Sequence, residues 1–302
     1  MQVLAVFGPT AVGKTGVAIA VAECLRERGE DPVAVNCDSI QVYRGLEVLS
    51  GAATDEEQSR LEHRLVSFID PSEEFSAGRY AEAAHREIDS LLVEGRRPIV
   101  VGGTGLYLRA ALADLDLQPP VPVEIRTAVE REIEERGPAA LHDELDPELA
   151  ATVDPNDRKR IARLTELVRA GIQPPRGAEP MWTASLRHPT LLIGLTMSRG
   201  LLAERIDARV DRMVEEGAAD EARRAAAAGA SRTARAALGF DELLEGDPTA
   251  MKRAHRAYTR RQLTWMRRMV GVTLVDRTGR DDAAVAAEIL ELLDPVVAGG
   301  RE

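Results

Sequence analysis

The sequence predicts an α/β fold, with a parallel sheet core built around a phosphate-binding loop and a helical insertion domain. Short apolar runs alternate with helical patterns through the first third of the chain, which is typical of a parallel sheet with crossover helices. A glycine-rich loop stands between the first apolar run and the first helical pattern. Two proline-rich segments flank a helical stretch. We therefore place the core at residues 1–117 and 189–302, and the insertion at residues 118–188.

The first third of the chain contains four expected strands and two long helices. The strands are expected near Val3–Phe7, Val33–Val35, Arg64–Phe68 and Ile99–Val101, and the helices at Lys14–Arg28 and Ser76–Glu94. Ser76 suits the N-cap of the second helix, and Gly95 suits its end. Active sites in parallel sheets gather at the carboxyl ends of the strands. Three segments should therefore lie together: Gly8–Thr15, Asn36–Gln41 and Gly102–Tyr107.

The pattern changes after Leu117. A stiff segment at residues 118–122 precedes helical patterns through Glu135, around Leu141 and through Asp157–Ala170, and residues 173–180 form the second proline-rich boundary. The run Leu191–Leu195 then returns to a buried strand. Helices dominate residues 198–269, residues 272–275 suit a last strand, and a terminal helix should end near Leu293.

A complete G-x-x-x-x-G-K-[ST] loop follows the first strand and opens the first helix. Its residues are Gly8, Pro9, Thr10, Ala11, Val12, Gly13, Lys14 and Thr15. Backbone N–H groups and the positive end of the helix suit an anion here, Lys14 adds a mobile positive charge, and the Thr15 hydroxyl suits Mg²⁺. The loop makes the core P-loop NTPase-like and predicts that a di- or triphosphate binds.

Asp38 and Thr104 follow the second and fourth strands, at the predicted ligand-binding edge of the sheet. Asp38 could be a general base, a Mg²⁺ ligand or a helix cap, and the residues alone leave these open. Thr104 follows Gly102 and Gly103, so its hydroxyl either enters the cleft or caps the next helix. The fourth strand ends without the acidic residue that P-loop NTPases commonly place there, which weakens an NTPase interpretation.

Composition places the chain among globular proteins and leaves two basic regions in an acidic whole. Of 302 residues, 44% are apolar and 29% charged, and the net charge is −11. No apolar stretch is long enough to cross a membrane, so we expect a cytoplasmic protein without membrane contact. Cys24 and Cys37 suggest no metal pair or disulfide, and we expect them to be small buried side chains.

The two basic regions are residues 158–187, with seven basic and two acidic side chains, and residues 251–268, with seven basic and none acidic. Each could neutralise phosphates or simply be a solvated helix face. Tyr258 and Trp265 lie seven residues apart on one predicted helical face, so we expect both to pack in the core.

Together these motifs resemble the tRNA dimethylallyltransferase family over nearly the whole chain. The resemblance lies in the phosphate loop, Asp38–Arg44, Gly102–Tyr107, Asp154–Asp157 with Arg160 and Arg163, Arg205 with Ile206, Arg209 and Met213, Leu238–Phe240 and Arg260–Trp265. The phosphate loop alone is shared by many families. The ordered set is far more specific.

The resemblance implies transfer of a dimethylallyl group from dimethylallyl diphosphate to N6 of the adenine 3′ of the anticodon, in tRNAs that read codons beginning with U. By the family's pattern, Asp38 is the base and Thr104 holds the amine, while Lys14 and Mg²⁺ on Thr15 stabilise the departing diphosphate. Arg205 and Arg209 either add to the diphosphate site or are exposed helix charges.

The family's tRNA contacts fall on Asp38, Ser39, Ile40, Gln41, Thr104, Arg126, Lys159, Arg160, Ile161, Ala162 and Arg163. The insertion would then grip the anticodon stem, and the target adenine would leave its stack to reach the cleft. We expect a monomer whose partners are tRNA and dimethylallyl diphosphate.

The chain departs from the family's usual residues at Ser50, Ala52, Ala53, Arg64 and Asp241, which affects secondary contacts. Three alternatives stay open. Prenylation of free adenine nucleotides would not need the basic insertion. A nucleoside or metabolite kinase would use the same loop and an aspartate base. A phosphate-binding RNA chaperone would leave Asp38 unexplained.

Overall fold

The computed structural model describes residues 1–174 and 185–293. The chain divides into two compact units, one formed by residues 1–115 and 184–302 and the other by residues 116–183. We call them the core unit and the insertion unit, and describe each by itself. The second predicted proline-rich segment falls mostly outside the described residues.

The core unit contains a six-stranded parallel sheet in the order β3-β2-β4-β1-β5-β6. The strands are β1 (Val3–Phe7), β2 (Pro32–Asn36), β3 (His63–Arg64), β4 (Arg97–Gly102), β5 (Thr190–Thr196) and β6 (Val272–Asp276). Every residue of β1, β2 and β4 is buried, as expected of central parallel strands. Phe7 lies in register with Gly102, and Asn36 with Val101, so these three strands end at one edge.

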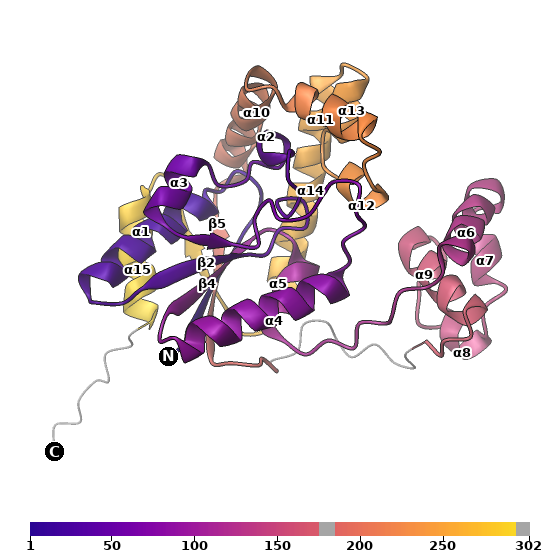
Figure 1. Cartoon of the computed structure of the whole chain (residues 1–302), viewed down its shortest axis with the longest axis horizontal. Coiled ribbons are helices and arrows are strands. Elements are labelled where there is room, and N and C mark those ends of the chain that lie inside the picture. The colour runs from indigo at the N-terminus through magenta and orange to yellow at the C-terminus, as the bar shows by residue number, and fades with distance from the viewer. Residues whose placement is uncertain (175–184, 294–302) are drawn as a thin grey trace. The chain divides into compact units, whose positions relative to one another are not determined.

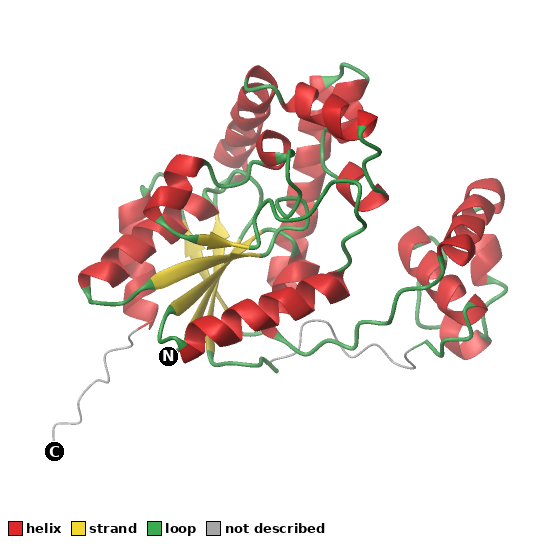
Figure 2. Cartoon of the chain, in the orientation of Figure 1, coloured by secondary structure: helices red, strands yellow, loops and turns green. Residues whose placement is uncertain are grey.

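Helices cover both faces of this sheet (Figures 1 and 2). On one face α1 (Lys14–Glu27) packs against α15 (Asp282–Leu293), and their apolar side chains share a core with β1, β4 and β5. On the other, α4 (Ala77–Val93) packs against α5 (Gly105–Leu112). Ser76 caps α4 by accepting the Arg79 N–H, as predicted.

A further group of helices stands beyond the carboxyl edge of the sheet (Figure 1). It contains α2 (Glu47–Ser50), α10 (Arg199–Glu215), α11 (Ala218–Ala227), α12 (Arg232–Arg235), α13 (Phe240–Leu244) and α14 (Pro248–Arg268), while α3 (Asp55–Arg60) lies near α1. The buried face of α14 holds Met251, His255, Thr259, Gln262 and Met266. The core role expected for Tyr258 and Trp265 is therefore wrong. Both are only partly buried, and their rings meet edge to face with centroids 6.1 Å apart.

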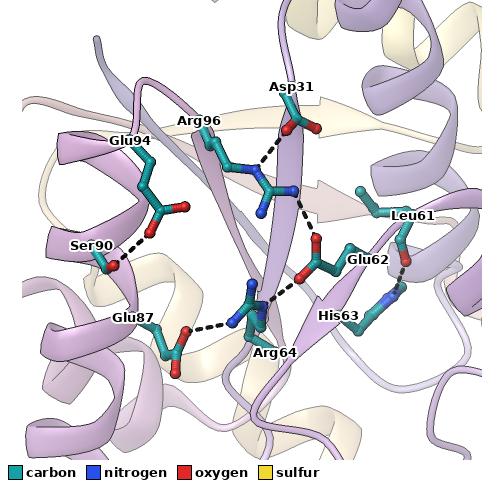
Figure 3. A network of polar contacts seen from close by, with 9 residues as sticks. All are labelled: Asp31, Leu61, Glu62, His63, Arg64, Glu87, Ser90, Glu94 and Arg96. Carbon is teal, nitrogen blue, oxygen red and sulfur yellow. Dashed lines mark hydrogen bonds and ion pairs between the residues drawn. The ribbon is translucent and has the colours of Figure 1, made fainter.

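The edge strand β3 is shorter than the predicted Arg64–Phe68. Leu65 and Ser67 have φ values of 61° and 49°, which extended strands do not allow, so the strand ends after two residues. Arg64 fastens it through Glu62 at 2.5 Å and through Glu87 of α4 at 3.4 Å (Figure 3). Arg64, one of the departures from the family's usual residues, thus holds an edge of the sheet.

The insertion unit has its own helices and its own small core. It comprises α6 (Val123–Arg136), α7 (Pro138–His142), α8 (Pro147–Ala150) and α9 (Arg158–Arg169). The core includes Val129, Ile133, Leu141 and Ile161, all nearly inaccessible to solvent. Because this cluster is separate from that of the core unit, the insertion packs as a domain in its own right. Among the described helices of the chain, none is both long and apolar enough to cross a membrane.

Candidate active site

The phosphate loop joins β1 to α1 in a conformation that turns N–H groups inward. Ala11 and Gly13 take the left-handed region, with φ values of 63° and 94°, and the residues around them do not. Such alternation curls the backbone into a concave nest for an anion. Gly13 is also the N-cap of α1 and supplies no side-chain cap, so the first N–H groups of α1 are left for a ligand.

Lys14 bends back over this loop. Its Nζ donates to the carbonyl oxygens of Gly8 at 3.1 Å and Pro9 at 3.0 Å. Burial, reinforced by the nearby Arg209 guanidinium, lowers the pKa of Lys14 to about 8, while the Asp38 carboxylate opposes this shift. The surroundings therefore disfavour the charged form of Lys14, and a bound diphosphate would stabilise it.

Arg277 supports the loop from behind, a role that the sequence analysis missed. Its guanidinium donates to the carbonyl oxygen of Val12 at 2.5 Å and pairs with Asp282. A Cβ atom on Gly13 would lie 2.0 Å from Arg277, and one on Gly16 would lie 2.2 Å from Asp282. The two glycines therefore make room for a partly buried ion pair beneath the nest. No local pattern marks Arg277, which comes 265 positions after Val12.

Asp38 sits in a tight turn after β2. Asn36 fixes this turn, because its side chain accepts the Asp38 N–H at 2.9 Å and donates to the Asp38 carbonyl oxygen at 3.1 Å. Asp38 Oδ1 accepts the Ile40 N–H at 3.0 Å, and no helix starts there. The helix-cap alternative is therefore excluded, while the base and metal-ligand alternatives remain. Cys37 beside it is fully buried, as expected, whereas Cys24 on α1 is only partly buried.

Thr104 occupies the N-cap position of α5, but its hydroxyl does not cap the helix. Instead, Thr104 Oγ1 accepts the Ser39 N–H at 3.2 Å and lies 3.4 Å from the hydroxyl of Tyr258. This geometry decides between the two alternatives that the sequence left open. The Thr104 hydroxyl belongs to the site, because it contacts Ser39, the residue that follows Asp38.

Gln262 ties these loops together from α14. Its Oε1 accepts the Thr10 N–H of the phosphate loop at 2.9 Å, and its Nε2 donates to the Gly103 carbonyl oxygen at 2.8 Å. Only 1% of its surface is exposed. A Cβ on Gly103 would lie 2.4 Å from Gln262 Nε2, so the amide needs a glycine there. Gln262 is a further site residue missed by the sequence analysis, although it lies inside a motif that was noted.

Arg209 and Arg205 lie one turn apart on α10 and have different surroundings. Arg209 donates to the carbonyl oxygens of Ser50 at 3.3 Å and Gly51 at 3.4 Å, and burial lowers its pKa. Its charge also acts on Lys14. Arg205 is exposed overall. The pKa of its guanidinium is nevertheless lowered, first by partial loss of hydration and second by the positive charge of Arg277. Arg209 is thus the arginine of the two whose charge acts on Lys14 of the phosphate loop.

The residues expected to contact tRNA have mixed positions. Lys159 and Arg160 are exposed near the start of α9, and Arg126 is half-buried on α6. The side chain of Ile161 is fully buried in the insertion core, so it cannot be presented to RNA. Arg163 holds the entry segment of the insertion through carbonyl oxygens of residues 118 and 119. In the core unit, Gln41 donates to the Gly51 carbonyl oxygen at 3.0 Å.

The basic face of α14 is divided in two. Lys252 and Arg256 pair with Asp211 and Asp207 of α10, so their charges support packing between helices. Further along, a surface hollow is lined by Ala257, Arg260, Arg261, Thr264, Trp265 and Arg268. Only this second half presents charge and an aromatic ring to solvent together.

Fold and site together define a P-loop α/β enzyme. It has a cradle for a di- or triphosphate, and it holds a carboxylate and a hydroxyl on neighbouring loops at the same sheet edge.

Comparisons with known proteins identify the family. A family model described as IPP transferase matches residues 41–269. A tRNA dimethylallyltransferase from Thermobifida fusca is 39% identical over 280 residues, covering 88% of this chain and 87% of the relative. The chain belongs to the tRNA dimethylallyltransferase family and is an enzyme of this type.

Solved structures agree with this assignment. A full-length tRNA isopentenylpyrophosphate transferase from Bacillus halodurans has a TM-score of 0.70 and 34% identity, covering 97% of this chain and 95% of its own. A eukaryotic dimethylallyltransferase, described as acting on tRNA, has a TM-score of 0.72 at 24% identity, covering 92% of this chain and 74% of its own. The latter supports the fold alone.

Proposed function

We propose that this protein transfers the dimethylallyl group of dimethylallyl diphosphate to N6 of the adenine 3′ of the anticodon, in tRNAs that read codons beginning with U. The observation that carries the proposal is that the Ser39 N–H, next to Asp38 in the chain, donates to Thr104 Oγ1, which brings the loops of Asp38 and Thr104 together at the sheet edge where the phosphate loop lies. Two hydrogen-bond acceptors there match the two N–H groups of an exocyclic amine.

The amine requires a base because its lone pair is delocalised into the purine ring. In the reaction a bond forms between N6 and the allylic carbon, the carbon–oxygen bond to the diphosphate breaks, and one N6 proton passes to the Asp38 carboxylate. Thr104 holds the second N–H and fixes the direction of the nitrogen. General-base assistance of this kind contributes about 10²–10⁴-fold.

The phosphate loop stabilises the diphosphate as it leaves. N–H groups of the nest and of the start of α1, together with Lys14, face the oxygen atoms on which charge develops. The Thr15 hydroxyl makes no hydrogen bond among the described contacts and lies in the first turn of α1, which fits a Mg²⁺ ligand. Such an ion would neutralise part of the diphosphate charge. In the part of the chain described, no group of three or more His, Cys, Asp or Glu residues forms a metal site.

The tRNA is proposed to bind both units. In the insertion, Lys159, Arg160 and Arg126 would contact the backbone of the anticodon stem, and in the core unit the exposed half of α14 would contact phosphates. The hollow lined by Arg260, Arg261 and Trp265 would offer positive charge and an aromatic face to a nucleotide of the RNA. Action as a monomer in the cytoplasm stays a prediction from the sequence.

One assay separates this proposal from its alternatives. Purified protein is incubated with labelled dimethylallyl diphosphate and Mg²⁺ in the presence of either unmodified tRNA or AMP, and in parallel with labelled ATP and nucleosides. Label in tRNA supports the proposal. Label in AMP but not in tRNA would establish an adenylate prenyltransferase, and labelled phosphate on a nucleoside would establish a kinase. Strand β4 is buried and ends at Gly102. It therefore lacks the carboxylate that P-loop NTPases commonly place there to bind the metal and water.

Asp38 variants test the base directly. Asp38→Asn keeps the shape of the side chain but cannot accept the proton, so we expect turnover to fall by about 10²–10⁴-fold with tRNA affinity nearly unchanged. Asp38→Ala should behave similarly. Near-normal turnover of either variant would remove Asp38 from this role.

A further inference from the structure

Helix α14 presents two polar side chains, one turn apart, to a single carbonyl group. The Gly103 oxygen accepts Gln262 Nε2 at 2.8 Å and the Tyr258 hydroxyl at 3.3 Å. The Tyr258 oxygen is also 3.4 Å from Thr104 Oγ1. Tyr258 therefore links the carbonyl of residue 103 to the hydroxyl of residue 104.

The direction of these bonds follows from the protons available. A tyrosine hydroxyl has one proton, and a carbonyl oxygen can only accept, so the bond to Gly103 uses the Tyr258 proton. The Tyr258 oxygen can then only accept from Thr104. Burial raises the pKa of the Tyr258 phenol, so it remains a donor near neutral pH. The proton of Thr104 is thereby directed toward Tyr258 and away from the site.

Thr104 Oγ1 is left as an acceptor. One of its lone pairs receives the Ser39 N–H at 3.2 Å, and the other is available to a ligand. The Ser39 hydroxyl, 3.4 Å away, is only partly buried and can turn its own proton elsewhere. Without the Tyr258 hydroxyl, Thr104 could rotate and donate into the site instead.

We propose that Tyr258 determines substrate specificity by holding the Thr104 hydroxyl as an acceptor, so that the site admits a 6-amino purine and rejects a 6-oxo purine. This inference rests on the proposed function. An amine offers N–H groups to both Asp38 and Thr104. A 6-oxo group would place its lone pairs against two acceptors, which leaves buried polar groups unpaired. Tyr258 acts through Thr104 and is a positioning residue.

The test compares two short anticodon stem-loop RNAs, one with adenosine and one with inosine at the target position. Dissociation constants are measured by fluorescence anisotropy in the presence of inorganic diphosphate and Mg²⁺, so that no transfer occurs. The wild type should bind the adenosine RNA at least about tenfold more tightly. Tyr258→Phe should reduce the ratio of the inosine to the adenosine dissociation constant about tenfold, because the freed Thr104 hydroxyl can donate to the 6-oxo group. Inosine also differs at N1, but this difference is common to both proteins and cancels between them.

A control variant and a stability measurement distinguish this role from a general loss of structure. Tyr43→Phe removes the hydroxyl of a different tyrosine, which is bonded to Thr233 at 2.6 Å, and should leave the ratio of the two dissociation constants at its wild-type value. Tyr258→Phe keeps the ring that packs on Trp265, and its melting temperature should lie within about 2 °C of the wild type.

The outcomes separate the two proposals. If the wild type transfers no label to tRNA, the proposed function fails and this inference fails with it. If the wild type is active but binds both RNAs equally, or if Tyr258→Phe keeps the wild-type ratio, only the inference about Tyr258 is overturned.

Discussion

The ionisation of Lys14 should control diphosphate binding within an accessible pH range. Burial and the Arg209 charge bring its pKa to about 8 in the free protein, from the ordinary 10.5. A bound diphosphate favours the charged form and raises this pKa again. The protonated fraction of free Lys14 is therefore about 90% at pH 7 and about 10% at pH 9.

The magnitude follows from that proton. We assume that the diphosphate binds well only when Lys14 is protonated. The dissociation constant is then multiplied by a factor of about 1 + 10^(pH − 8), which is close to one at pH 7 and about eleven at pH 9. Each further pH unit costs about 1.4 kcal/mol, until binding reaches the level that the backbone cradle provides alone. Diphosphate affinity is therefore highest below pH 8, where Lys14 is protonated, and it falls as the pH rises above 8.

Calorimetric titration with a diphosphate and Mg²⁺ between pH 6.5 and pH 9.5 measures this dependence. Lys14→Met has no proton to lose, so its weaker binding should reveal only the ionisation of the diphosphate itself. Arg209→Gln removes a like charge and should move the inflection to higher pH, because Lys14 then holds its proton more easily. Identical pH profiles for the wild type and Lys14→Met would refute the reasoning.

Three other predictions concern single side chains. Arg160→Ala should weaken tRNA binding and reduce the slope of log affinity against log salt by about one, measured by filter binding; an unchanged slope would make Arg160 an ordinary exposed charge. Arg277→Met should cost about 1–3 kcal/mol in urea unfolding, because it leaves Asp282 without its partner and Val12 without a donor, and a cost near zero would contradict the support role. Arg64→Ala should cost under about 1 kcal/mol in the same measurement, since Arg64 and Glu87 are both about a third exposed; a larger loss would show that the edge of the sheet depends on them.

Much of the core was predictable because its signals are local. Strands β1, β2, β4, β5 and β6 were all expected within two residues of their ends, since buried parallel strands read as continuous apolar runs. The edge strand β3 was predicted too long. There the apolar pattern continued after the backbone had turned, at Leu65 and Ser67.

The candidate site divides in the same way. The phosphate loop could be read directly, because its glycines, lysine and threonine stand together between a strand and a helix. Asp38 could be placed at the carboxyl edge of the sheet, but the helix-cap alternative was removed only by its turn. Ile161 is buried and its neighbour Arg160 is exposed because of the side on which α9 packs within the insertion unit, which the sequence did not give.

The sequence by itself determined the family's order of motifs, the phosphate cradle and the two basic regions. Only the tertiary structure decided that the Thr104 hydroxyl contacts Ser39 and Tyr258 and does not cap its own helix. It also decided that Gln262 joins the phosphate loop to Gly103. The physical reason is distance along the chain. Gln262 reaches Thr10 across 252 positions, so the buried amide has no local pattern to reveal it, and its partners are fixed only when α14 packs against the sheet edge.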